Sequence, residues 1–147
     1  MTMRLSTGLR SKMLDGGASG GLKGALDGGK INIYSGPQPV SADSGATGTL
    51  LATVDAAGLG LTFDAAVAGA ISKAAAEDWE FTGLANGTAG WFRFFPAAGD
   101  PSTTSTTEAR IDGSIANAGG DLRVSNVSIV TGAPNAVHIF KLTLPAQ

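Results

Sequence analysis

The sequence predicts an all-β protein, an antiparallel β-sandwich or jelly roll preceded by a short N-terminal arm that is helical or extended. From Lys30 onward, short runs of alternating apolar and polar residues are separated by turn residues, as in sandwiches and barrels. Seven glycines between Gly16 and Gly29 exclude a long stable helix before that point. Since 147 residues fit one core, we expect an arm over residues 1–29 and one β domain over residues 30–147.

The arm contains two short helical signals. Ser6 or Thr7 can cap a helix that ends at Gly16 and Gly17, because serine and threonine accept a hydrogen bond from the first turn and glycine ends helices. A second helical turn is expected over residues 22–26. We therefore expect one or two helical turns followed by the β domain.

Eight to ten strands are expected in the β domain, each marked by alternation and bounded by turn residues. In one of them Leu50, Ala52 and Val54 fall on the same face. A polar stretch rich in Ser and Thr, AAGDPSTTSTT, marks an exposed loop, which is either a plain connection or an outward contact loop. The expected strand segments are 30–35, 47–54, 59–65, 66–72, 77–81, 90–95, 109–115, 121–130 and 136–145.

The run GWFRFF carries aromatic side chains on both faces of one strand. Phe92 and Phe94 face one way, whereas Trp91, Arg93 and Phe95 face the other. Such a strand is covered on its second side either by another layer of the same chain or by a neighbouring subunit, and both explanations remain open. Since Trp and Arg are enriched at interfaces, the second explanation places a subunit contact at four residues, Trp79, Trp91, Arg93 and Phe95.

Composition limits the possible functions. Charged residues make up only 15% of the chain, and the mean hydropathy is +0.16, which favours a protein that works within an assembly. A net charge of −2 without a basic stripe argues against a nucleic-acid partner, and no apolar stretch is long enough to span a membrane. There is no cysteine and one histidine, His138, so we expect no catalytic residues, no metal site and no cofactor, and the protein is not expected to be an enzyme.

The chain resembles small tailed-bacteriophage virion structural proteins. The likeness covers about residues 3–145 and is most specific at IYSGPQP and GTAGWFRFF. It implies a component of the phage particle, made in the cytoplasm of the host bacterium and located in the virion. The leading hypothesis is a capsid decoration, or cement, protein that stabilises the assembled shell by binding it. Two alternatives are a tail, connector or fibre-attachment component and a carbohydrate-binding module that stacks sugars on Tyr34, Trp79 and Trp91.

The decoration hypothesis requires two kinds of partner. One is the protein itself, as a dimer or trimer, and the other is the major capsid protein or another virion protein. The N-terminal arm is expected to reach the shell while the β domain folds independently of it. The residues assigned to that contact are Met3, Arg4, Leu5, Leu9, Arg10 and Met13.

Overall fold

The computed structural model describes residues 3–15 and 21–144, and within them strands dominate at 42% against 11% helix. The expected helix end at Gly16 and Gly17 lies outside the described residues. In chain order the elements are β1 (Arg4–Leu5), α1 (Thr7–Asp15), α2 (Gly21–Leu26), β2 (Lys30–Ser35), β3 (Leu50–Val54), β4 (Ala70–Ser72), β5 (Trp79–Thr82), β6 (Gly87–Phe95), β7 (Ile111–Ala116), β8 (Leu122–Val124), β9 (Ser128–Ile129) and β10 (Pro134–Thr143).

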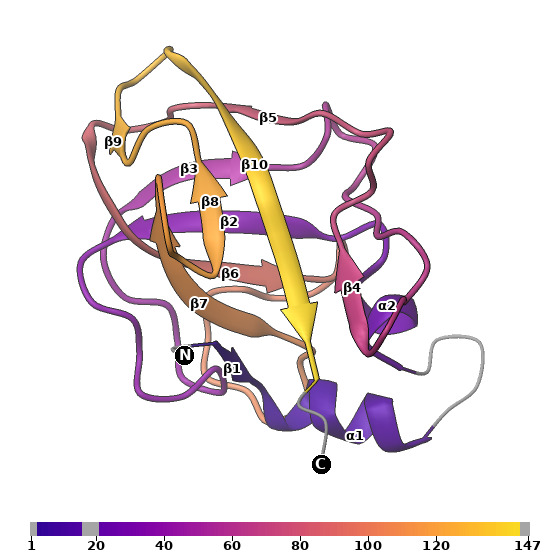
Figure 1. Ribbon diagram of the computed structural model, residues 1–147. Coiled ribbons are helices and arrows are strands. Elements are labelled where there is room, and N and C mark those ends of the chain that lie inside the picture. Colours follow the sequence, from indigo (N-terminus) through magenta and orange to yellow (C-terminus); the bar gives the residue numbers. More distant parts are fainter. Residues whose placement is uncertain (1–2, 16–20, 145–147) are drawn as a thin grey trace.

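The strands form one curled mixed sheet (Figure 1). Its order is β3-β2-β6-β7-β8-β10-β4, with β1 added to β7, β5 to β10 and β9 to β6. The β7–β8 pair is parallel, while the other strand pairs are antiparallel. The curl brings the segment after β5 to β3, where the Leu84 N–H donates to the Leu51 carbonyl at 2.8 Å. The all-β class is confirmed, whereas the finer prediction of an antiparallel sandwich or jelly roll is not.

A register shift changes which side chains of β3 face the core. The β2–β3 ladder shifts between Ile33 and Tyr34, and the extra residue in β3 places Leu51 inside and Leu50 outside. The prediction that Leu50 shares the buried face of its strand is therefore wrong. The expected strand over residues 59–65 is also reduced to isolated bridges, at Leu61 and Phe63.

The core is built around five aromatic rings from four parts of the chain. Phe63 stacks on Phe94 with centroids 5.3 Å apart, and Phe140 meets Phe92 edge to face at 5.6 Å. Trp79 lies 6.1 Å from Phe140. These rings pack together on the inner side of the curled sheet. One strand, β6, supplies two of the five, Phe92 and Phe94.

The N-terminal segment is part of this core. Leu9 and Leu26 are fully buried in it, and β1 pairs with β7. The Ser6 hydroxyl caps α1 by accepting the Leu9 N–H at 3.1 Å, accepts the Arg110 N–H at 2.8 Å, and donates to the Glu108 carbonyl at 2.7 Å. The predicted cap and the second helical turn are confirmed. The separate arm is corrected, because Leu9, Leu22 and Leu26 of this segment are buried by the chain itself.

Replacing Leu9 with alanine should lower the free energy of unfolding by about 2–5 kcal/mol, because it leaves a cavity in a packed core. Leu14 is the matched control, since it lies on the same helix but is 87% exposed, and Leu14→Ala should change stability by less than about 0.5 kcal/mol. Urea denaturation followed by circular dichroism measures both variants. Equal effects would show that the helix does not contribute to the core.

Candidate functional site

The four residues predicted at a subunit interface lie inside the single chain. Trp79, Trp91 and Arg93 are almost fully buried, and Phe95 is the most exposed of the four at 6%. The surface contact predicted for them is therefore corrected, because another subunit cannot reach these side chains. Sugars cannot stack on Tyr34, Trp79 and Trp91 either, since Tyr34 is also buried.

The second face of β6 is covered by two long loops of the same chain. On this face the Trp91 ring stacks on Tyr34, with centroids 4.7 Å apart, and its indole N–H donates to the Thr47 carbonyl at 3.2 Å. The Arg93 guanidinium lies 5.3 Å from the Trp91 ring. The covering segments are residues 36–49 and 96–110, and they are joined to each other by the Ala46 N–H, which donates to the Ser102 carbonyl at 3.0 Å.

A buried charge cluster fixes the second of these loops. Arg93 donates two hydrogen bonds of 2.7 Å to the two carboxylate oxygens of Asp112, its neighbour across β6 and β7, and a third to the Pro101 carbonyl at 2.8 Å. Arg110 donates to the carbonyls of Thr103, at 2.8 Å, and Asp100. Burial raises the pKa of Asp112, with Arg93 opposing that shift, while burial and the neighbouring Arg93 lower the pKa of Arg110. The polar loop is thus a rigid part of the body.

The Asp112→Asn substitution should destabilise the fold by about 3–5 kcal/mol, because it leaves the buried Arg93 without its counter-charge. The double variant Arg93→Met, Asp112→Leu removes both charges and should be more stable than the single variant. Chemical denaturation measures the two stabilities, and limited proteolysis within residues 97–107 reports whether the loop is released. A single variant as stable as the wild type would contradict the counter-charge role.

A second carboxylate, that of Glu77, ties the segment after β3 to β5. It accepts the Thr62 N–H at 3.0 Å, the Thr62 hydroxyl at 2.6 Å and the Trp79 indole N–H at 2.8 Å. Partial burial alone would raise the pKa of Glu77. The hydrogen bonds from Thr62 and Trp79 together lower the pKa by more than burial raises it, so the pKa lies below the ordinary 4.5. The ionised form therefore stabilises the folded state.

Acidification should remove the Glu77 contribution to stability. Because the folded-state pKa is depressed, the contribution is complete above the unfolded value of 4.5 and is lost as the pH falls through the folded value. We expect Glu77→Gln to be less stable than the wild type at pH 7 but to lose less stability between pH 7 and about pH 3.5. Urea midpoints at both pH values measure this difference. Parallel losses in the two proteins would assign the acid sensitivity to other carboxylates.

The residues predicted to contact a shell are divided between core and surface. Leu9 is buried, and Met3, Leu5 and Met13 are partly buried against the core. Arg4 and Arg10 are exposed, but Arg4 donates to the Pro39 carbonyl and Arg10 to the Thr7 hydroxyl at 2.9 Å. The first helix therefore presents only its outer side to a partner.

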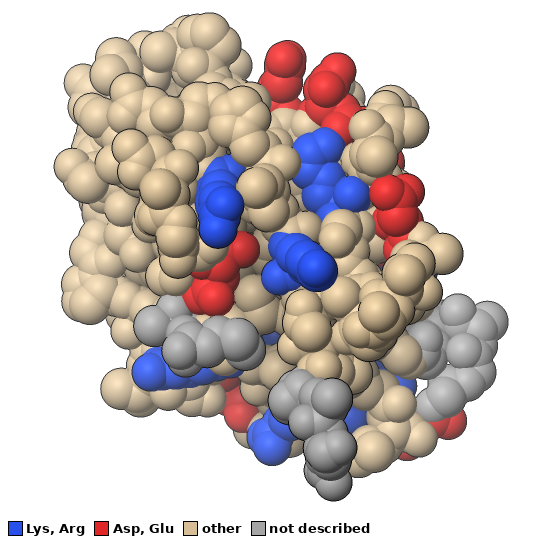
Figure 2. Space-filling model, viewed as in Figure 1, with Lys and Arg blue, Asp and Glu red and all other residues tan. Residues whose placement is uncertain are grey.

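One end of the curled sheet carries no charged side chain. It consists of residues 44–51, 82–90 and 124–136, and Figure 2 shows the corresponding upper left of the molecule without Lys, Arg, Asp or Glu. Leu84 and Val130 are 58% and 52% exposed there. The Thr131 N–H donates to the Asn86 side chain at 2.8 Å, and the Gly132 N–H donates to the Gly83 carbonyl at 2.9 Å, so these two segments are tied to each other. We call this surface the uncharged end.

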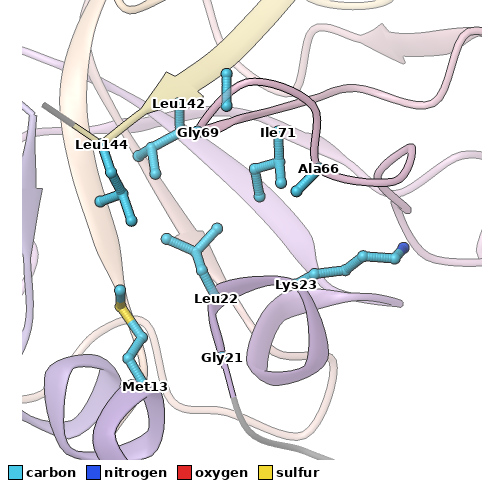
Figure 3. A pocket seen from close by; sticks show the side chains of 10 residues that line it. Met13, Gly21, Leu22, Lys23, Ala66, Gly69, Ile71, Leu142 and Leu144 are labelled. Carbon is cyan, nitrogen blue, oxygen red and sulfur yellow. The ribbon is translucent and has the colours of Figure 1, made fainter. Parts of the chain in front are cut away.

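A second surface feature is an apolar groove between the helices and β10. Figure 3 shows Met13, Leu22, Ile71 and Leu144 around an open hollow of about 320 Å³. Lys23 is the charged residue in its lining. Exposed apolar surface of this kind is typical of contact sites.

Chemically active side chains are scattered over the described part of the chain. Within it, no three His, Cys, Asp or Glu residues are close enough together to hold a metal ion. His138 shares a hydrogen bond of 2.7 Å with the Ser125 hydroxyl on the exposed side of β10 and β8. None of the helices in residues 3–15 and 21–144 is long and apolar enough to cross a membrane.

Comparison with models of known families, with curated proteins and with solved structures gave no match for this chain. Its resemblance to phage proteins therefore stays a prediction from the sequence. Sequence reasoning missed the uncharged end, although its three segments lie in runs without a charged residue, at 44–54, 81–92 and 124–137. The runs are visible in the sequence, but their convergence depends on the topology of the sheet.

Proposed function

We propose that this protein is a non-enzymatic structural component of a tailed-bacteriophage particle, and that it decorates the capsid. The observation that carries the proposal is the uncharged end, a rigid surface with exposed leucine and valine in a protein whose sequence resembles phage virion proteins. Interface cores are depleted of charged residues because charges lose their hydration on contact. The uncharged end fits the shell-facing surface of such a protein.

Rigidity favours the same role. Hydrogen bonds from Thr131 to Asn86 and from Gly132 to Gly83 link two segments of the uncharged end, and the bond from Ala46 to Ser102 joins the third to the loop that Arg93 and Arg110 hold, so less conformational entropy is lost when the body binds. A protein that binds only the assembled shell stabilises that state by mass action, and many copies act together. Contact through the uncharged end replaces the contact that the sequence assigned to an N-terminal arm.

The particle itself provides the test. Particles are purified from a strain that carries the gene, and the amount of this chain per particle is measured by quantitative mass spectrometry. On the order of hundreds of copies would support decoration of the shell, whereas roughly six to a few dozen would support a tail or connector component. Absence of the chain from purified particles would overturn the proposal.

Charge introduced at the uncharged end should weaken attachment without unfolding the protein. We expect Leu84→Asp and Val130→Asp together to reduce occupancy on particles by about tenfold or more, because each aspartate must be desolvated in the contact. Leu59→Asp is the matched control, since Leu59 is 88% exposed on the turn after β3, outside the uncharged end. Occupancy that is unchanged in the double variant, with folding intact, would remove the uncharged end from the contact.

A further inference from the structure

The apolar groove is lined by elements from near both ends of the described chain and by β4. Met13 comes from α1, Leu22 from α2, Ile71 from β4, and Leu142 and Leu144 from β10 and the residue after it. In Figure 3 these side chains point toward one another across the hollow. Water in such a hollow meets almost only hydrocarbon, so an apolar occupant is favoured.

The same chain carries an exposed apolar turn beside the groove. Residues 65–70, AAVAGA, contain no polar side chain, and Val67 is 72% exposed. Two backbone hydrogen bonds between Val67 and Ala70, of 2.9 and 3.0 Å, close a two-residue turn. We call residues 64–70, which add Asp64 at the base, the apolar turn.

The backbone of this turn is unusual for its sequence. Ala68 has φ 50° and Gly69 has φ 73°, so both central residues are left-handed. Asparagine followed by glycine is preferred in such turns, because a Cβ-bearing residue other than Asn or Asp is strained there. Ala68 has a methyl group at a position where the side chain of asparagine would suit the backbone better. An alanine is favoured there if an apolar surface of a partner covers the tip of the turn.

Groove and turn are placed for reciprocal contact. Ala66 and Gly69 form one wall of the groove, so the turn lies directly at its edge. A two-fold axis beside that wall brings the turn of each copy to the groove of the other, which is the arrangement of an isologous dimer. Charge is compatible as well, since Asp64 at the base of the turn is exposed, and Lys23 in the groove wall, which pairs with Asp27 of its own chain at 2.5 Å, keeps 42% of its side chain exposed.

We propose that two copies of this chain pair about a two-fold axis, with the apolar turn of each copy seated in the groove of the other. The proposal rests on the proposed function, in which copies assemble, and it names the surface by which they do so. A stable interface buries about 800 Å² on each partner. Beyond the groove, the exposed side chain of Leu14 extends the apolar area over α1.

Analytical ultracentrifugation of the full chain tests the pairing. The wild type should form a dimer, and Val67→Asp should raise its dissociation constant by about 100-fold or more, because a carboxylate would enter an apolar groove. Leu59→Asp should remain dimeric, since Leu59 lies on a different exposed turn. A wild type that stays monomeric at every concentration, or a Val67→Asp variant that still dimerises, would overturn the proposal.

Asparagine substitutions separate a role in pairing from a role in folding. Ala68→Asn should raise the thermal midpoint under conditions where the protein is monomeric, because asparagine suits a left-handed turn, yet it should weaken the dimer about tenfold by burying an amide. Ala57, exposed and with φ 56° in the turn after β3, gives the matched control: Ala57→Asn should raise the midpoint and leave the dimer unchanged. Equal dimer affinities for the two variants would count against the groove.

Cysteine pairing locates the contact directly, because the chain has no cysteine of its own. A Val67→Cys protein mixed with a Met13→Cys protein should form a mixed disulfide under mild oxidation. A Val40→Cys protein mixed with the same Met13→Cys protein should form much less of it.

If the wild type is monomeric and groove variants lose particle occupancy, another virion protein occupies the groove and the pairing proposal fails alone. If pairing holds but the chain is absent from particles, the proposed function fails alone.

Discussion

The structure depends on a strand that must be covered on both faces. β6 places Phe92 and Phe94 in the concave core and Trp91, Arg93 and Phe95 on the opposite side, so a single layer of sheet cannot bury it. The chain meets this requirement with two loops. Arg93, held by Asp112, donates to the Pro101 carbonyl of the second loop, and the first loop is joined to the second by the hydrogen bond from Ala46 to Ser102. Covering by loops is possible because the carbonyl groups that they bury are satisfied by the two guanidinium groups.

Alternation in the sequence was enough to locate most strands, because strands such as β2, β5 and β6 each have a consistently buried face. It predicted residues 30–35 closely and residues 90–95 as part of a strand that begins at Gly87. The preference of serine and threonine for helix starts predicted a cap at Ser6 or Thr7, and Ser6 is the cap. Register shifts were not predictable, since a bulge such as that at Leu51 leaves no distinct pattern of residue types. Nor was the parallel β7–β8 pair, which depends on where β10 lies.

The candidate surfaces were harder to predict than the strands, and the reason is the same for each. Aromatic content indicated that Trp91 and Arg93 needed a cover, but composition does not say whether the cover is a loop or a subunit. The polar loop 97–107 has the composition of a free connection, yet Arg93 and Arg110 hold its backbone. A useful signal was present in the two strands themselves, because Arg93 and Asp112 are opposite charges within apolar runs, which indicates a buried pair.

Charge in this molecule is segregated rather than merely scarce. Hairpin ends bring three charge-free runs to one end of the sheet, while the groove wall and the apolar turn each keep one charged residue, Lys23 and Asp64. The two surfaces therefore differ in how they respond to salt. Contacts between uncharged surfaces depend little on ionic strength, whereas an exposed Lys–Asp contact weakens as salt rises. If the uncharged end meets a shell and the groove meets a second copy, as proposed, the shell contact would depend little on salt whereas the pairing would weaken as salt rises.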